Sequence, residues 1–175
     1  MNLEKLRDRL PDFAKDIKLN LSSIFCTDGS PDLSEEQIKS VALASAYATK
    51  NPTVIMAIEG EVSASLSAET KQAAKAVATI MAMNNIYYRF LHLLGDDEVR
   101  KLPAKMRMNI IANPGVEKRE FELMSLAVSV LNGCGMCIEA HARQLTEQGL
   151  SKLAVQSTAR IAAVVNAAAQ AVELM

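Results

Sequence analysis

Three residues in the last third of the chain have the types and the spacing for thiol redox chemistry. Cys134, Cys137 and His141 follow one another at intervals of three and four positions, so one face of a helix would present all three. A Cys-x-x-Cys order brings two sulfurs within reach of a disulfide, and a helix start or a nearby imidazolium stabilises a thiolate. The sequence therefore predicts a redox-active thiol pair that is assisted by His141.

The two cysteines of this motif are not equivalent. Cys134 lies nearer the expected start of the helix, where the helix dipole favours a thiolate. Cys137 lies one turn before His141 and can contact the imidazole directly. Because a positioned base can remove a proton at the moment of attack and a fixed dipole cannot, we favour Cys137 as the attacking thiol.

A zinc site and a pair of inert buried cysteines are alternative interpretations of the motif. Zinc would need a fourth ligand, and the chain offers only Cys26, His92 and carboxylates, at spacings that match no common zinc motif. Free cysteines are often buried. However, Gly133 and Gly135 flank the first cysteine, where they cost helix stability and let a partner or substrate approach the backbone. Attachment of c-type haem is excluded because Ile138 follows the second cysteine.

Other polar residues are weaker candidates. Glu122 lies in the preceding predicted helix, where a carboxylate could orient His141 or relay protons, although spacing alone favours an exposed side chain. Glu139 lies off the face shared by the cysteines and is expected to face solvent. The segments Asn84-Asn85 and Tyr87-Tyr88-Arg89 are candidates for holding a turn or an interface.

The bulk properties of the chain exclude several classes of protein. Its 175 residues fit one domain, 1–175, and a formal net charge of -1 disfavours nucleic-acid binding. No apolar run approaches the roughly 20 residues that span a bilayer, and the mixed charges of Met1–Asp8 are unlike a secretory signal peptide. We therefore expect a cytoplasmic protein without a membrane segment, in which three cysteines, an odd number, form no structural disulfide framework.

The composition and the positions of capping and helix-breaking residues predict an all-α fold. Half of the residues are hydrophobic, yet only 4% are aromatic and Trp is absent, so Ala, Leu, Ile, Val and nine Met must fill the core. Small side chains let helices pack closely, and no segment alternates as a strand does. Helical spacing, a capping box at Ser34–Gln37 and a glycine cap at Gly95 predict helices over 3–10, 12–24, 34–50, 52–66, 67–94, 105–112, 117–131, 134–148 and 151–175.

Two parts of the chain resemble each other weakly. A gap-free alignment of Ala76-Val77 with Ala127-Val128 sets Met83–Ile86 against Cys134–Cys137. Identities are few, and an Ala-rich chain also produces such matches by chance. A true duplication would mean that two similar helical units pack together and that only the second carries the thiols.

The chain as a whole resembles the alkyl hydroperoxide reductase AhpD family. The resemblance is co-linear over nearly the whole length, which makes it specific although each segment by itself is weak. It rests on Lys15–Ser23, Met83–Asn85, Arg107–Gly115, Phe121–Leu123 and the block Asn132–Cys137 followed by His141.

This resemblance implies a fold, an activity and a set of partners. The fold would be all-helical, of the carboxymuconolactone decarboxylase type, with two similar halves, and the protein a homotrimer. It would reduce the peroxiredoxin AhpC and, to some extent, hydroperoxides. Electrons would come from the dihydrolipoyl group of a lipoyl-bearing acyltransferase, charged through the flavoprotein lipoamide dehydrogenase. That group is a reducing substrate, so no bound cofactor or metal is expected.

The resemblance also assigns roles to the site residues. Cys137 would form the sulfenic acid or mixed disulfide, and Cys134 would donate a proton and then close the Cys134–Cys137 disulfide. Glu122 and His141 would relay protons. Relatives can carry a histidine at the position of Met136, which cannot transfer protons, so the relay is either shorter here or does not need that histidine.

The resulting hypothesis is a lipoyl-dependent thiol peroxidase and disulfide reductase. Three alternatives stay open: another enzyme of the carboxymuconolactone decarboxylase fold in which the thiols are incidental, a zinc-binding or structural protein, and a disulfide carrier that never meets peroxide itself.

Overall fold

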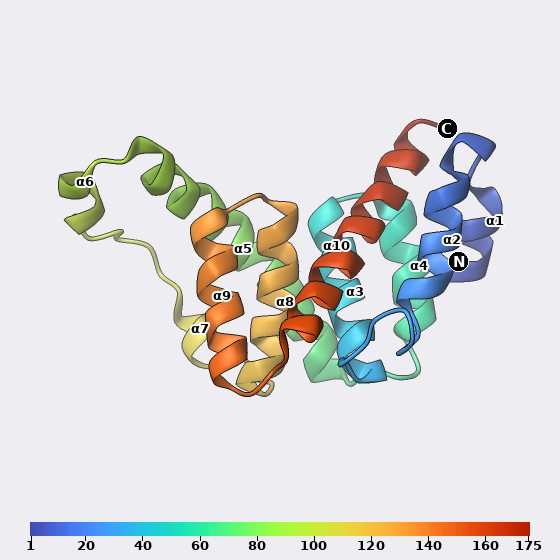
Figure 1. Cartoon of the computed structure of the whole chain (residues 1–175), viewed down its shortest axis with the longest axis horizontal. Coiled ribbons are helices and arrows are strands. Elements are labelled where there is room, and N and C mark those ends of the chain that lie inside the picture. The colour runs from blue at the N-terminus through green and yellow to red at the C-terminus, as the bar shows by residue number, and fades with distance from the viewer.

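The computed structural model describes residues 1–175, and all of its regular elements are helical, which confirms the predicted all-α class (Figure 1). A short 3₁₀ turn, Asp12–Ala14, precedes the second α-helix. The α-helices are α1 (Leu3–Arg9), α2 (Lys15–Ile24), α3 (Glu35–Thr49), α4 (Pro52–Val62), α5 (Ala68–Leu94), α6 (Asp97–Lys101), α7 (Asn109–Ala112), α8 (Lys118–Leu131), α9 (Gly135–Glu147) and α10 (Lys152–Glu173).

The predicted start and stop signals mark most helix ends. Ser34 and Gln37 form the expected capping box at the start of α3, and Gly95 ends α5 in the left-handed conformation. The prediction of a helix over 105–112 is wrong in its first half. Lys105 has a φ of 51°, which an α-helix does not contain, and only the last turn of that segment is helical.

Two central helices, α3 and α8, hold the fold together. Each packs against the other and against α5 and α10, while α3 also contacts α4 and α8 also contacts α9. Their buried faces carry small side chains, among them Ala44 and Ser45 on α3 and Ser125, Ala127 and Ser129 on α8, all fully buried. Small side chains at the contact allow a short distance between helix axes. The Ala-rich composition therefore serves close helix packing.

The helices form two similar units, α3–α4–α5 and α8–α9–α10. In each unit a central helix, a tight turn and a shorter helix are followed by a long helix capped by a serine, Ser67 or Ser151. The tight turns also match. Lys50 and Gly133 have positive φ angles of 61° and 65°, and the next residue, Asn51 or Cys134, caps the following helix with its side chain. The expected two-unit architecture is thus present.

The register of the gap-free alignment is wrong. Met83–Ile86 lies inside the continuous helix α5, whereas Cys134–Cys137 starts α9. The structural counterpart of Cys134–Cys137 is Asn51–Val54, which starts α4 in the same way. Ala-rich helices repeat similar residues at every turn, so sequence likeness there fixes the register poorly.

The end of α5 and the segment that follows it extend away from the packed helices (Figure 1). α6 lies at the tip of this projection, and the chain returns through α7 to α8. Both termini lie at the other end of the molecule, where α1, α2 and α4 are found (Figure 1). None of the helices has both the length and the apolar character required to cross a membrane.

The matched turns predict that introducing glycine at Lys50 stabilises the protein and that removing glycine at Gly133 destabilises it. Lys50→Gly should raise the free energy of unfolding by about 1 kcal/mol, because only glycine adopts positive φ without steric cost. Gly133→Ala should lower it by a similar amount, since an added Cβ meets only Arg89 at 3.9 Å and the strain is that of the backbone alone. Urea unfolding measures both. Gln72→Gly, on an exposed turn of α5, is the control and should cost about 1 kcal/mol; a loss of stability in Lys50→Gly would contradict the interpretation.

Candidate redox site

The turn between α8 and α9 places the first cysteine at a helix start. The backbone N–H of Cys134 donates to the carbonyl oxygen of Ser129 at 3.2 Å, which closes α8, and Gly133 supplies the left-handed residue. Cys134 then caps α9, and its sulfur accepts the backbone N–H of Cys137 at 3.3 Å. The two sulfurs are joined in a disulfide. The local sequence therefore puts one sulfur of the pair on the positive end of α9.

The two cysteines differ in their burial and in their surroundings. Cys134 is fully buried, whereas Cys137 is 7% exposed and lines a cavity together with His141. From spacing alone, the helix dipole favoured a thiolate at Cys134, whereas the nearby imidazole favoured one at Cys137. Tertiary structure gives each cysteine one of these features: Cys134 has the helix end, and Cys137 has the cavity and the histidine.

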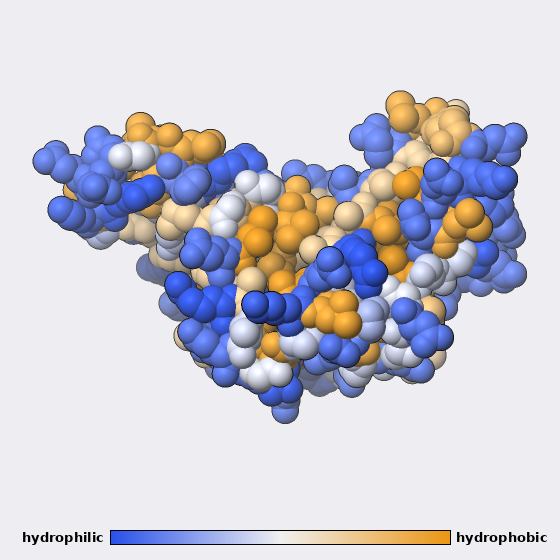
Figure 2. All heavy atoms as spheres, viewed as in Figure 1, coloured by the Kyte–Doolittle hydropathy of each residue, from blue (hydrophilic) through white to orange (hydrophobic).

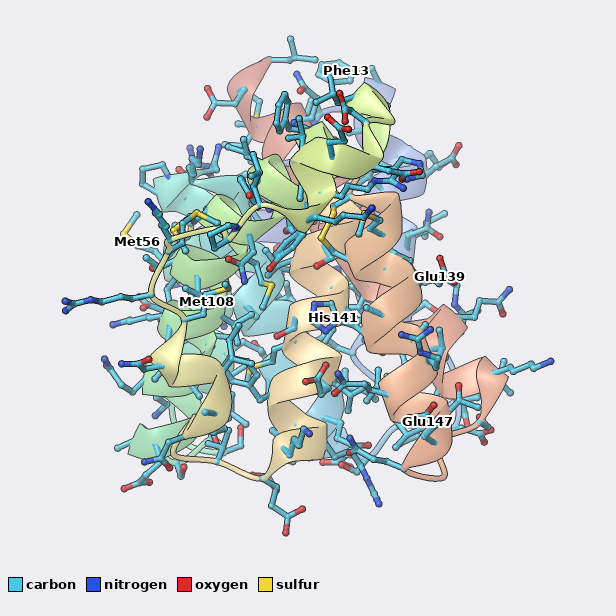
Figure 3. All side chains as sticks on the ribbon, turned by 90° about the vertical axis from the view of Figure 1, so that its left-hand side faces the viewer. Phe13, Met56, Met108, Glu139, His141 and Glu147 are labelled. Atoms are coloured by element: carbon cyan, nitrogen blue, oxygen red, sulfur yellow. A yellow bond between two sulfur atoms is a disulfide. The ribbon has the colours of Figure 1, made fainter.

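Glu122 and His141 form a buried hydrogen bond between α8 and α9. Glu122 Oε2 lies 2.6 Å from His141 Nδ1, and the side chains are only 3% and 14% exposed. The expectation from spacing, an exposed Glu122, is therefore wrong. The sequence identified Glu122 as a carboxylate that could orient His141, but local spacing could not show the contact, because the carboxyl and the ring come from different helices; the family resemblance then assigned both to a relay. Figure 3 shows His141 between the ribbons of α8 and α9.

This hydrogen bond defines the role that each ring nitrogen can take. A carboxylate only accepts, so Nδ1 carries the hydrogen when it binds Glu122, and Nε2 is the nitrogen with a free lone pair. His141 also lines the cavity that contains Cys137. The pair can therefore present a basic nitrogen on the same side as the accessible sulfur.

The cavity beside Cys137 measures about 240 Å³ and is mostly apolar. Its walls come from three parts of the chain: α5, the segment around α7, and α9. Met108 and Ile111 close it from the α7 segment, and Met136 from α9. Met108 and His141 are both labelled on this face of the molecule (Figure 3). Met136, where the family resemblance implies that a histidine can stand, thus forms part of the wall.

A chain of hydrogen bonds fixes the turn before the cysteines to α5. Asn85 Nδ2 donates to Ser129 Oγ at 2.9 Å, and Asn132 Nδ2 donates to Asn85 Oδ1 at 2.9 Å. Arg89 Nη1 donates to the carbonyl oxygen of Asn132 at 2.5 Å. The sequence indicated a turn or an interface as the role of these α5 residues, and the structure assigns Asn85 and Arg89 to the turn.

A second acid on α8, Glu120, belongs to another contact. Its Oε1 accepts a hydrogen bond from Ser40 Oγ on α3. Burial raises the pKa of Glu120, and the carboxylates of Glu36 and Glu117 add to the rise, while the bond from Ser40 opposes it. Glu120 therefore joins α8 to α3, whereas Glu122 faces α9.

The weaker candidates lie apart from the thiol pair. Glu139 is exposed on the outer side of α9, as expected (Figure 3). Cys26 is a free, exposed thiol whose sulfur donates to the carbonyl oxygen of Ser23, and His92 lies at the surface. No group of three or more His, Cys, Asp and Glu side chains is arranged to hold a metal ion.

Comparison with known proteins agrees with this fold. Residues 97–175, which contain α8, α9 and α10, match the carboxymuconolactone decarboxylase family. A Coxiella burnetii protein named alkyl hydroperoxide reductase AhpD is 56% identical over 168 residues, which cover 96% of this chain and 95% of that protein. Proteins of the same name from a Bradyrhizobium species and from Rhodospirillum centenum are 51% and 50% identical, over 99% and 97% of this chain and 94% and 89% of their own lengths. The chain belongs to the alkyl hydroperoxide reductase AhpD family.

The Glu122–His141 bond predicts how reactive the reduced thiols are. Glu122→Gln keeps the shape, but its amide N–H can donate to Nδ1 and so move the ring hydrogen to Nε2. We expect alkylation of the reduced pair by iodoacetamide to slow at least about tenfold, because the base is lost. Mass spectrometry of the labelled peptide over time measures the rate.

Matched variants separate this effect from a general loss of charge. Glu139→Gln removes an exposed carboxylate from α9 and should leave the labelling rate unchanged. His141→Ala should lower the free energy of unfolding by about 3–5 kcal/mol, since it strands a buried carboxyl group. Equal labelling rates in Glu122→Gln and the wild type would show that the bond does not control the thiols.

Proposed function

We propose that this protein is a lipoyl-dependent thiol peroxidase and disulfide reductase in which Cys137 attacks, Cys134 resolves, and His141 and Glu122 move the protons. One observation carries the proposal. Cys137 lines an apolar cavity together with His141, while Cys134 is fully buried and caps the N-terminus of α9. Of the two cysteines, Cys137 is therefore the one beside the space for a substrate, and Cys134 is held where a leaving thiolate is stabilised.

In the first step His141 takes the thiol proton of Cys137, and the thiolate attacks the terminal oxygen of a hydroperoxide. An S–O bond forms and the O–O bond breaks, with its electron pair going to the alkoxide. The imidazolium of His141 returns the proton to the alkoxide, which leaves as an alcohol. Cys137 is now a sulfenic acid, oxidised by two electrons. Glu122 holds the ring in place through both proton transfers.

In the second step Cys134 attacks the sulfenic sulfur of Cys137. The S–S bond forms, hydroxide leaves, and the proton of the Cys134 thiol converts the hydroxide to water. This is the disulfide present in the structure. The sum of the two steps is one dithiol and one hydroperoxide giving a disulfide, an alcohol and water. Reduction of a peroxiredoxin disulfide would begin with the same Cys137 thiolate, through a mixed disulfide.

A dihydrolipoyl group would restore the thiols by exchange. One of its thiolates attacks the accessible Cys137 sulfur, and Cys134 leaves as a thiolate stabilised by the helix end. The second lipoyl thiol then releases Cys137, so the lipoyl group takes up the two electrons as a disulfide. A low-pKa leaving thiol speeds such exchange. The position of Cys134 on the α9 N-terminus supports this direction of attack.

The partners of the proposed reaction follow from the family. The relatives carry the name alkyl hydroperoxide reductase, and the family resemblance adds the peroxiredoxin AhpC and a lipoyl-bearing acyltransferase served by lipoamide dehydrogenase. Comparing direct hydroperoxide consumption with reduction of AhpC distinguishes a peroxidase from a disulfide carrier. An activity that survives alkylation of both thiols would favour another reaction of the carboxymuconolactone decarboxylase fold.

The division of labour between the cysteines predicts different failures of the two serine variants. Cys137→Ser should abolish hydroperoxide consumption with dihydrolipoamide, because the cysteine that lines the cavity with His141 is gone. Cys134→Ser should still oxidise Cys137 once, to a sulfenic acid that dimedone traps as an adduct visible by mass spectrometry. Cys26→Ser is the control and should retain full turnover. Full turnover in Cys137→Ser would refute the mechanism.

We also propose that the protein forms the homotrimer expected of its family, through the projecting end of α5. Large apolar side chains are exposed there, with Leu93 75% exposed, and Figure 2 shows hydrophobic atoms gathered on this projection. A monomer rarely exposes such a continuous patch. The patch consists of Ile86, Phe90, Leu93 and Leu94, which lie together on α5.

Charge placed in this patch should dissociate the assembly. We expect the wild type to elute as a trimer and the double variant Phe90→Glu, Leu93→Glu as a monomer, because a carboxylate cannot be buried unpaired. Size-exclusion chromatography with light scattering measures the mass. Leu19→Glu, at an isolated exposed leucine of α2, should remain trimeric. A monomeric wild type at micromolar concentration would exclude the proposed assembly.

A further inference from the structure

One polar side chain in the cavity wall has no partner. Asn84, on α5, is only 5% exposed and lines the cavity with Cys137 and His141, yet its Oδ1 accepts no hydrogen bond. The adjacent Asn85 shows the contrast. Both ends of that amide are bonded, to Ser129 and to Asn132. Asn84 therefore does not take part in the network that fixes the turn.

The fold itself does not need an amide at this position. The two units match from their capping serines, Ser67 on α5 and Ser151 on α10, and at the position of Asn84 the helix α10 carries Ala168, which is fully buried. A buried polar atom without a partner is destabilising, and such atoms are rare in native proteins. The oxygen itself has almost no accessible surface, so a molecule in the cavity would bind the N–H end of the amide, which has no partner in the protein either, and that contact explains why the amide is kept.

The chemistry of the amide discriminates among the substrates of the proposed function, on which this inference rests. An asparagine side chain offers one acceptor oxygen and two N–H donors. The oxygens of a hydroperoxide are good acceptors for the N–H end of the amide. The sulfurs of a disulfide or a thiol are only weak acceptors. The remaining wall, with Met81, Met108, Ile111 and Ala140, suits a hydrocarbon group.

We propose that Asn84 binds the O–O–H group of an organic hydroperoxide and directs its terminal oxygen toward Cys137. The amide contacts the substrate before and during attack, and it takes no proton and no electron. The thiolate still forms the S–O bond, the O–O electron pair still goes to the alkoxide, and His141 still supplies the proton. The apolar wall makes organic hydroperoxides better substrates than hydrogen peroxide.

The test uses Asn84→Leu, which preserves the size of the side chain and removes both hydrogen-bonding ends. Two half-reactions are measured separately: oxidation of the reduced protein by cumene hydroperoxide or hydrogen peroxide, and reduction of the disulfide by dihydrolipoamide. In the wild type, cumene hydroperoxide should react faster than hydrogen peroxide. In Asn84→Leu the rate constant with each peroxide should fall about tenfold, as expected for one lost hydrogen bond at the reacting group. Reduction by dihydrolipoamide should change less than about twofold, because the sulfurs that react in this step are only weak acceptors for the amide N–H.

The thermal stability of Asn84→Leu distinguishes a role in binding from a structural role. If Asn84 had a structural role, its loss would lower the thermal midpoint. Removing an unsatisfied buried amide should raise the thermal midpoint of the oxidised protein by about 2–4 °C. Asn84→Ser, which retains a hydroxyl in the wall, should recover part of the peroxide rate, and Asn20→Leu on the exposed face of α2 should change neither rate. Peroxide oxidation at the wild-type rate in Asn84→Leu, or equal slowing of both half-reactions with a lower midpoint, would overturn the inference. A wild type that fails to react with any hydroperoxide would instead refute the proposed function.

Discussion

The hydrogen bond between Glu122 and His141 joins α8 to α9, with the Glu122 side chain only 3% and the His141 side chain 14% exposed. Its geometry constrains several features at once. It holds the His141 ring against α8 through Nδ1, on the side of α9 where His141 and Cys137 line the cavity. Because a stranded buried charge is destabilising, the packing of α9 on α8 depends on both members of the pair.

The repeat shows how one fold can be both scaffold and reactive site. The turn from α3 to α4 and the turn from α8 to α9 use the same device, a left-handed residue followed by a side chain that caps the next helix. In the first unit the cap is Asn51, whose oxygen simply satisfies a backbone N–H. In the second unit it is Cys134, so the same geometry places a sulfur on a positive helix end. The side-chain cap that the turn requires is therefore, in the second unit, a sulfur in the field of a helix N-terminus.

Buried polar groups are divided between the two tasks. Ser129, Asn85 and Asn132 satisfy one another and hold the cysteine turn rigidly against α5. Asn84, one residue away, is buried without a partner for its oxygen and lies in the cavity wall. Proteins tend to depart from full internal satisfaction at sites that bind or react, where stability is exchanged for function. Asn85 therefore bonds to the cysteine turn while Asn84 lies in the cavity wall. One helix can direct them differently because neighbouring side chains point about 100° apart.

The sequence by itself determined the features that depend on neighbours along the chain. Helical periodicity, the capping box at Ser34 and the glycine cap at Gly95 predicted the class and most helix ends, and the spacing of Cys134, Cys137 and His141 put them on one helix. These features arise within one or two turns, so local residue types specify them. Tertiary structure alone decided that Glu122 is buried against His141, that only Cys137 faces the cavity, and that Asn51 rather than Met83 is the counterpart of Cys134. Each of these depends on how separate helices pack against one another. The periodicity of a helix shows which of its faces is buried, but it does not show which residue of another helix that face will contact.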